Sequence, residues 1–129
     1  MSDLVNRLQK TKGVFSLTPA SKADIEYAEK QLGLSFANEY REFLRTFGAV
    51  SFESHEIVGI TQHKRLNVVD VTKKEREFNS NIPGSYYVVE ELNIDGIVIW
   101  QDGDGNVYQT FPEREPERIA NSLSEYLFV

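Results

Sequence analysis

The segment from Leu32 to Ile60 constrains the fold most, because its pattern changes from helix to strand part-way along. In its first half, large apolar side chains recur at the spacing of one face of an α-helix. These side chains, all aromatic except one, are Phe36, Tyr40, Phe43, Leu44 and Phe47. Gly48 predicts the end of this helix, since a residue without a Cβ takes the left-handed conformation of a helix C-terminus at low cost. Beyond it, residues 50–60 predict a pair of strands with a turn near His55.

Two further helices are predicted before this one. The apolar spacing over residues 4–8 predicts a short amphipathic helix that stops at Gly13. Ser21 and Asp24 have the spacing of a capping pair and predict the start of the next helix, which ends at Gly33. The apolar stripe of that helix consists of Ile25, Ala28 and Leu32.

The second half of the chain is patterned mainly as antiparallel strands. Residues 86–111 predict a meander of three strands, with Asp102–Asn106 as a hairpin turn. Its central strand is Ile97–Trp100, which is apolar without alternation, as in a strand covered on both faces. Residues 67–79 predict a short helix with an extended beginning, because β-branched residues precede helix-favouring ones. Residues 112–117 predict a charged connector.

A closing helix is predicted near the C-terminus, introduced by Asn121 or Ser122. The residues predicted to line it are Ile119, Leu123, Tyr126 and Leu127. The order of helices, strands and a closing helix predicts an α+β fold, in which N-terminal helices and a C-terminal helix pack on a mainly antiparallel sheet. A chain of 129 residues has the size of one domain, so a single domain is expected over residues 1–129.

Composition limits both the compartment and the chemistry. Cysteine is absent, which excludes disulfides, thiolate nucleophiles and thiolate metal sites. No apolar run approaches the roughly 18 residues of a membrane span. The first residues also lack the basic and apolar regions of a secretory signal. These features predict a cytoplasmic protein that does not bind membranes.

The net charge of −6 comes from the last third of the chain. Residues 1–85 hold 12 basic and 11 acidic side chains, whereas residues 86–129 hold two basic and nine acidic ones. An acidic surface repels polyanions, so nucleic-acid binding is not expected. Such a surface attracts basic proteins, although many cytosolic proteins are acidic for solubility alone.

Three patterns could carry chemistry, and each has a simpler structural interpretation. His55 and His63 lack converging ligands, so no metal site is expected and His55 is interpreted as hydrogen-bonding at a turn. The Asp102–Asn106 turn resembles a calcium loop, but Val107 stands where that loop requires glycine. A carboxylate-based hydrolase needs two converging acids. Adjacent strand residues such as Glu90-Glu91 point to opposite faces instead. We therefore expect neither catalysis nor a cofactor.

Five segments resemble the SUKH superfamily, which includes fungal cell-wall-synthesis regulators and many bacterial immunity proteins. These segments are IEYAEKQLG (25–33), YREFLRTFGAVSFESHEIVGI (40–60), VVDVTKKEREFN (68–79), YYVVEELNIDGIVIWQDGDGNVYQT (86–110) and IANSLSEYL (119–127). One departure is visible, because many members have a Leu-Pro pattern before the second helix, where this chain has Ser35-Phe36. The resemblance covers most of the chain and implies a single SUKH-like domain.

The resemblance implies a non-enzymatic binding domain, most directly an immunity protein. Its partner would be a cognate toxin domain or another basic protein; for a nuclease toxin, carboxylates would occupy the basic cleft. The residues expected to bind are Glu90, Glu91, Asp95, Asp102, Asp104, Glu113, Glu115 and Glu117, with Trp100 or Tyr108 as the central contact. For Trp100, a core position is favoured over an interface one. The alternative function is that of an intracellular regulatory or scaffold module. The sequence does not predict an oligomeric state.

Overall fold

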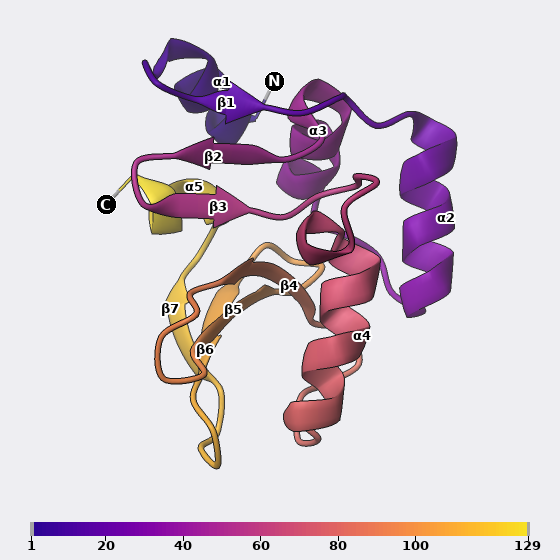
Figure 1. The fold of residues 1–129 in the computed structure, drawn as a ribbon, viewed down its shortest axis with the longest axis vertical. Helices are drawn as coiled ribbons and strands as arrows, with labels where there is room; N and C mark the ends of the chain where they lie inside the picture. The colour runs from indigo at the N-terminus through magenta and orange to yellow at the C-terminus, as the bar shows by residue number, and fades with distance from the viewer. Residues whose placement is uncertain (1, 129) are drawn as a thin grey trace.

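The computed structural model describes residues 2–128, which form two antiparallel sheets surrounded by helices (Figure 1). The strand order is β1-β2-β3 in the first sheet and β4-β5-β6-β7 in the second. This architecture confirms the predicted α+β class. No helix among the described residues is long and apolar enough to cross a membrane. In chain order the elements are α1 (Asp3–Lys10), β1 (Phe15–Ser16), α2 (Lys22–Leu32), α3 (Asn38–Phe47), β2 (Val50–Phe52), β3 (His55–Ile57), η1 (Lys64–Leu66), α4 (Val68–Phe78), β4 (Tyr87–Glu91), β5 (Val98–Gln101), β6 (Val107–Thr110), β7 (Glu117–Ala120) and α5 (Leu123–Leu127).

The two sheets meet where β3 approaches β4. Directly after β3, Val58 donates its backbone N–H to the carbonyl of Val89 at 2.9 Å. The strand pair predicted within residues 50–60 and the meander predicted within residues 86–111 are therefore both confirmed, in two separate sheets. The central strand β5 is buried along its whole length, as its apolar sequence predicted.

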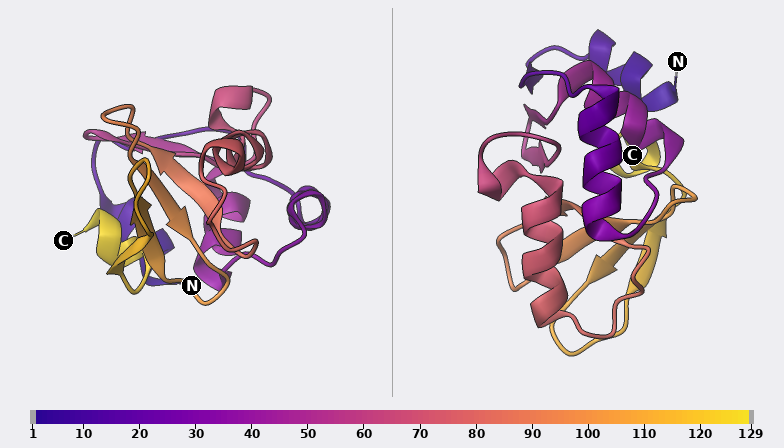
Figure 2. Two further views of the ribbon diagram at one scale, coloured as in Figure 1. Left: turned by 90° about the horizontal axis from the view of Figure 1, so that it is seen from below. Right: turned by 90° about the vertical axis from the view of Figure 1, so that its right-hand side faces the viewer.

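The helices pack on this pair of sheets in different places. The first helix, α1, packs against α3 and α5, while α4 packs against β4. The remaining helix, α2, lies beside α4, and the right-hand view of Figure 2 shows the two standing side by side. The predicted capping pair of α2 is present, because Ser21 accepts from the N–H of Asp24 at 3.1 Å and Asp24 accepts from the N–H of Ser21 at 3.1 Å.

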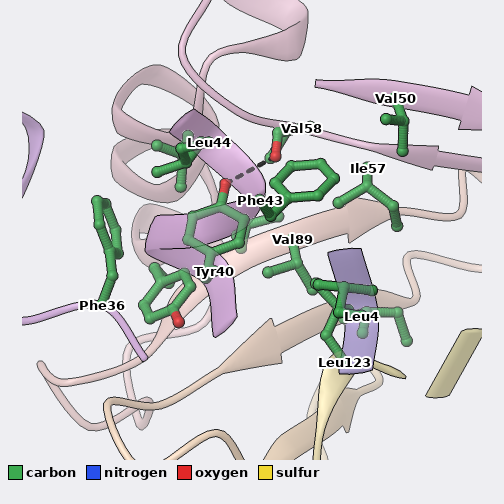
Figure 3. Close-up of a cluster of buried hydrophobic side chains, with 14 of the residues drawn as sticks. Leu4, Phe36, Tyr40, Phe43, Leu44, Val50, Ile57, Val58, Val89 and Leu123 are labelled. Atoms are coloured by element: carbon green, nitrogen blue, oxygen red, sulfur yellow. Dashed lines mark hydrogen bonds between the residues drawn. The ribbon is translucent and has the colours of Figure 1, made fainter. Parts of the chain in front are cut away.

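The aromatic face of α3 lies at the centre of the core, as predicted. The hydroxyl of Tyr40 donates to the carbonyl of Val58 at 2.7 Å and so fixes α3 to the chain after β3 (Figure 3). Burial raises the pKa of Tyr40 well above its ordinary value. Phe36 lies just before α3 instead of within it, yet its ring centroid is 5.2 Å from that of Tyr40 and 4.8 Å from that of Tyr87.

The extended beginning predicted for residues 67–79 is wrong, because α4 is helical from Val68 onward. The Asn67 side chain accepts from the backbone N–H groups of Val69 and Asp70, at 3.0 and 3.4 Å, and caps the helix. Val68 and Val71 are buried. Capping and core packing together outweigh the weak β preference of the branched side chains.

Two short strands were not predicted. The first, β1, lies in a segment without an evident pattern, and the second, β7, includes Ile119, which had been expected in the closing helix. That helix, α5, is accordingly short and begins after Ser122, whose side chain accepts from the N–H of Glu125 at 3.0 Å. Ser122 is thus the N-cap, one of the two residues predicted for that position.

Candidate protein-binding surface

The acidic residues of the meander divide between the two ends of the β4–β7 sheet. Successive turns of an antiparallel meander lie at opposite ends, so the β5–β6 turn places Asp102 and Asp104 away from Asp95 in the β4–β5 turn. The β6–β7 turn joins Asp95, because a Cβ added to Gly96 would lie 2.8 Å from the ring of Pro112. The acids that were expected to bind one partner therefore lie on two separate surfaces.

Glu90, which was expected to bind a partner, is a structural residue and does not belong to the candidate surface. Its side chain is buried, with the residue 1% exposed. The carboxylate accepts the backbone N–H of Glu56 at 2.7 Å and the hydroxyl of Tyr126 at 2.6 Å, and lies 3.1 Å from Nδ1 of His55. Burial, followed by the hydrogen bond to Glu90 and its charge, raises the pKa of Tyr126. His55, in β3, is therefore one of the residues that surround the buried carboxylate of Glu90.

Trp100 does not belong to the candidate surface either, because it is fully buried, at 0% exposure. Its indole Nε1 donates to the hydroxyl of Thr110 at 2.9 Å, which satisfies its only polar group inside the protein. With no exposed surface, this side chain cannot contact a partner of the folded domain. The core interpretation of Trp100 is the one that the structure supports.

Glu91 points to the opposite side of β4 from Glu90, as predicted, and pairs with a lysine of α4. Its Oε2 lies 2.7 Å from Nζ of Lys74, which is 3.8 Å from Oε2 of Glu75. Burial and the neighbouring Glu91 raise the pKa of Glu75 to about 7. Against the opposing effect of burial, hydrogen bonds with Glu75 and Lys74 lower the pKa of Glu91. Glu91 is therefore already neutralised within the domain.

Asp102 holds the β5–β6 turn together. Its Oδ1 accepts from the backbone N–H groups of Asp104 and Asn106, both at 3.0 Å, and its Oδ2 accepts the hydroxyl of Tyr108 at 2.9 Å. The ring of Tyr108 stacks on Tyr86 with centroids 4.3 Å apart. Burial, followed by hydrogen bonds and charge from Tyr86 and Asp102, raises the pKa of Tyr108. At this end of the sheet, only Asp104 remains as an exposed predicted acid.

The other end of the sheet carries the remaining predicted acids, which are all exposed: Asp95, Glu113, Glu115 and Glu117. None of these four acids has a Lys, Arg or His nitrogen within 4.0 Å among the ion pairs of residues 2–128. Asp95 and Glu113 have φ angles of 53° and 64°, a left-handed conformation that is strained for a glutamate. Together with Phe78 at the end of α4, these acids define the distal surface: Phe78, Asp95, Glu113, Glu115 and Glu117.

Phe78 was not singled out from the sequence, although it is 75% exposed. It borders a groove of about 280 Å³ between the α4–β4 connection and the β6–β7 turn, whose lining includes Ile82, Phe111, Glu113 and Glu115. Figure 1 shows both segments at the bottom of the molecule, and Figure 2 shows them close together. The available signal was its position on the flank of the buried α4 stripe, in the helix's last turn.

The family described as SUKH_5, SMI1-KNR4 cell-wall, matches residues 1–128. The chain belongs to the SUKH superfamily. A search of curated proteins found no match. SUKH domains are generally non-catalytic folds.

Glu39, in α3, is a second acid of this SUKH domain whose pKa is raised, besides Glu75. Burial raises its pKa, against hydrogen bonds from Leu123, Gln101 and Ser124. Its Oε2 accepts from Nε2 of Gln101 and from the backbone N–H of Leu123, both at 2.6 Å. These bonds attach α5 to α3 and β5, which is a structural role. Among residues 2–128, no three His, Asp or Glu side chains gather in a group that could hold a metal ion.

Proposed function

We propose that this SUKH domain is an immunity protein that binds a cognate bacterial toxin domain through the distal surface and neutralises it in the cytosol. The observation that carries the proposal is the combination of exposed acids, which have no ion-pair partner within residues 2–128, with an exposed aromatic ring beside a groove. Acidic side chains steer a basic partner toward this end of the sheet. Aromatic side chains at the centre of an interface supply most of its affinity.

The two kinds of side chain have different energetic roles. Burying an exposed phenylalanine against a partner contributes about 1.5–3 kcal/mol. An exposed ion pair between a carboxylate and a cation of the partner contributes about 0–1 kcal/mol to affinity, and it acts mainly on the rate of encounter. Within the groove, the guanidinium of Arg114 lies 5.3 Å from the ring centroid of Phe111. Arg114 is thus positioned over an aromatic ring, while Glu113 and Glu115 line the groove and are available to a partner's cations.

The charge of the distal surface fits a toxin with a basic active site. A nuclease must attract a polyanion, so the entrance of its cleft is lined by lysine and arginine. A protein that presents carboxylates at such an entrance competes with the phosphates of the substrate. Binding there blocks the toxin without any chemistry by the immunity protein.

The decisive experiment co-expresses this chain with the C-terminal domain of a secreted toxin encoded beside its gene. We expect growth to be restored and the two proteins to purify as a one-to-one complex. Phe78→Ser should reduce rescue, whereas Phe15→Ser, at an equally exposed aromatic on another face, should not. Failure of rescue, together with several weakly bound host proteins, would contradict the proposal and favour a regulatory or scaffold module.

A further inference from the structure

Ile94, in the turn between β4 and β5, is a large apolar residue that lies open to solvent. It is 62% exposed, whereas Leu92 and Ile97 in the same turn are half-buried and pack against the core. A single exposed isoleucine is common on protein surfaces and indicates nothing by itself. Two further observations distinguish Ile94, namely the conformation of its turn and its position beside the distal surface.

The β4–β5 turn fixes the backbone on both sides of Ile94. The carbonyl of Ile94 accepts the N–H of Ile97 at 3.0 Å, and the carbonyl of Ile97 accepts the N–H of Leu92 at 3.2 Å. Asp95 and Gly96 have φ angles of 53° and 70°. Positive φ at both central residues is typical of a type I′ turn, for which Asp-Gly is a preferred sequence. A side chain presented by a closed turn loses little backbone entropy when a partner covers it.

The β6–β7 turn lies between the turn that carries Ile94 and the end of α4 that carries Phe78. On one side it packs on the β4–β5 turn, since a Cβ added to Gly96 would lie 2.8 Å from Cγ of Pro112. On its other side, residues 113–116 line the groove that Phe78 borders. Figure 1 shows these segments together at the lower end of the molecule. Ile94 and Phe78 therefore flank the β6–β7 turn, and both are exposed at the same end of the sheet.

Acidic side chains lie between these two apolar residues. Glu113 and Glu115 belong to the β6–β7 turn, and Asp95 directly follows Ile94. The two turns, residues 92–97 and 111–116, hold these three acids against one base, Arg114. A partner with a basic face complements this charge, whereas nucleic acid, anionic lipid and acidic proteins are repelled.

We propose that the cognate toxin domain contacts this chain on both sides of the β6–β7 turn, with Ile94 as a second apolar anchor beside Phe78. The proposal rests on the proposed function, because it describes how the same partner is bound. It also gives the partner a definite chemistry: two apolar depressions separated by lysine and arginine side chains. The depressions receive Ile94 and Phe78, and the cations between them face Glu113 and Glu115. Two anchors on different elements fix the orientation of the partner, which a single exposed ring does not.

Dissociation kinetics of the full chain from the toxin domain encoded beside its gene test the proposal. Ile94→Ser should increase the dissociation rate about 10- to 100-fold, as expected when a buried branched side chain is lost from an interface. Leu17→Ser is the matched control, because it removes an exposed branched side chain from another face and should leave the rate unchanged. Phe78→Ser should act independently, so the double variant should show about the product of the two increases.

Hydrogen exchange of the wild-type complex gives a second measurement that needs no substitution. The amides of residues 92–97 and those of residues 78–82 should both exchange more slowly in the complex than in the free protein. The amides of residues 14–17, on another face, should exchange at the same rate in both states. Circular dichroism and thermal unfolding establish that each variant used in the kinetics is folded.

The outcomes separate this proposal from the proposed function. A wild type that does not bind the toxin domain contradicts the proposed function, and the second anchor with it. A stable wild-type complex from which Ile94→Ser dissociates no faster than Leu17→Ser overturns the second anchor alone. The same conclusion follows if binding protects residues 78–82 but leaves residues 92–97 exchanging as in the free protein, because the partner would then contact only one side of the β6–β7 turn.

Discussion

Tyr126 of α5 donates its hydroxyl hydrogen to Oε1 of Glu90 in β4 at 2.6 Å, joining the closing helix to the second sheet. The same carboxylate accepts the backbone N–H of Glu56 at 2.7 Å and lies 3.1 Å from Nδ1 of His55, both in β3. One buried side chain thus connects both sheets and the last helix. A buried carboxylate is stable only with such partners, and each partner relies on the carboxylate in turn.

Removing this carboxylate should destabilise the domain strongly. Glu90→Ala leaves the hydroxyl of the half-buried Tyr126 and the N–H of Glu56 without their acceptor, so we expect a loss of about 3 kcal/mol in the free energy of unfolding. Tyr126→Phe removes one charge-assisted bond and should cost about 1.5 kcal/mol. Urea denaturation measures both. Glu117→Ala, on the exposed edge strand, is the control and should stay within about 0.5 kcal/mol of the wild type.

Gly59 should tolerate no side chain, because two backbone segments cross there. A Cβ added to it would lie 1.5 Å from the carbonyl oxygen of Gly48, which accepts the N–H of Ile60 at 3.1 Å. Gly59→Ala must therefore separate the end of α3 from the chain after β3, and we expect a loss of about 3 kcal/mol or more. Gly84→Ala, with nothing within 4 Å of the added Cβ, should change stability by less than about 1 kcal/mol. Equal effects of the two substitutions would contradict this account.

Elements with a local physical cause could be predicted from the sequence. The capping pair of Ser21 and Asp24, the aromatic face of α3 and the Asp102–Asn106 turn each depend on residues a few positions apart. By contrast, β7 exists through its pairing with β6, in which Arg118 lies opposite Tyr108. Nothing within residues 112–117 or Arg118 itself distinguishes such a strand from a charged connector.

The sequence predicts that the candidate surface is acidic, but it does not show which acids belong to that surface. Glu90 and Glu117 look alike in the sequence, and both belong to the acidic last third of the chain. Glu90 is buried because His55 and Tyr126, each about 35 positions away, converge on it. Phe78 is exposed because α4 extends to the edge of the domain. Long-range contacts decide which acids are free.

Stability should fall with rising pH over the range set by Glu75. In the folded protein the pKa of Glu75 is raised from 4.5 to about 7. Between these values the folded state keeps a proton that the unfolded chain releases, so this contribution to stability is present below pH 4.5 and is lost as the pH rises through 7. Because the carboxyl is only partly buried, we expect a decline of about 1 kcal/mol.

Glu75→Gln should remove that decline, because the amide is neutral at every pH. Urea denaturation at pH 5 and pH 8 measures the difference for each variant. Glu77→Gln, an exposed position on the same helix, is the matched control and should keep the wild-type dependence. Glu91 acts in the opposite direction at lower pH: its pKa is lowered below 4.5, so its contribution is lost only as the pH falls through that lowered value. An unchanged decline in Glu75→Gln would show that another group causes it.

Charge reversal on the distal surface should slow association with the toxin domain. The triple variant Asp95→Lys, Glu113→Lys and Glu115→Lys replaces unpaired acids at one end of the sheet, so we expect the association rate to fall about 10- to 100-fold at low salt. The difference should shrink at high salt, where the charges are screened. Asp104→Lys is the control, because Asp104 is equally exposed but lies at the opposite end of the sheet. Stopped-flow or surface-plasmon kinetics separate this effect from that of Phe78→Ser, which should mainly increase the dissociation rate. If Asp104→Lys slows association as much as one reversal on the distal surface does, the partner senses only the net charge of the chain, and the distal surface is not where it binds.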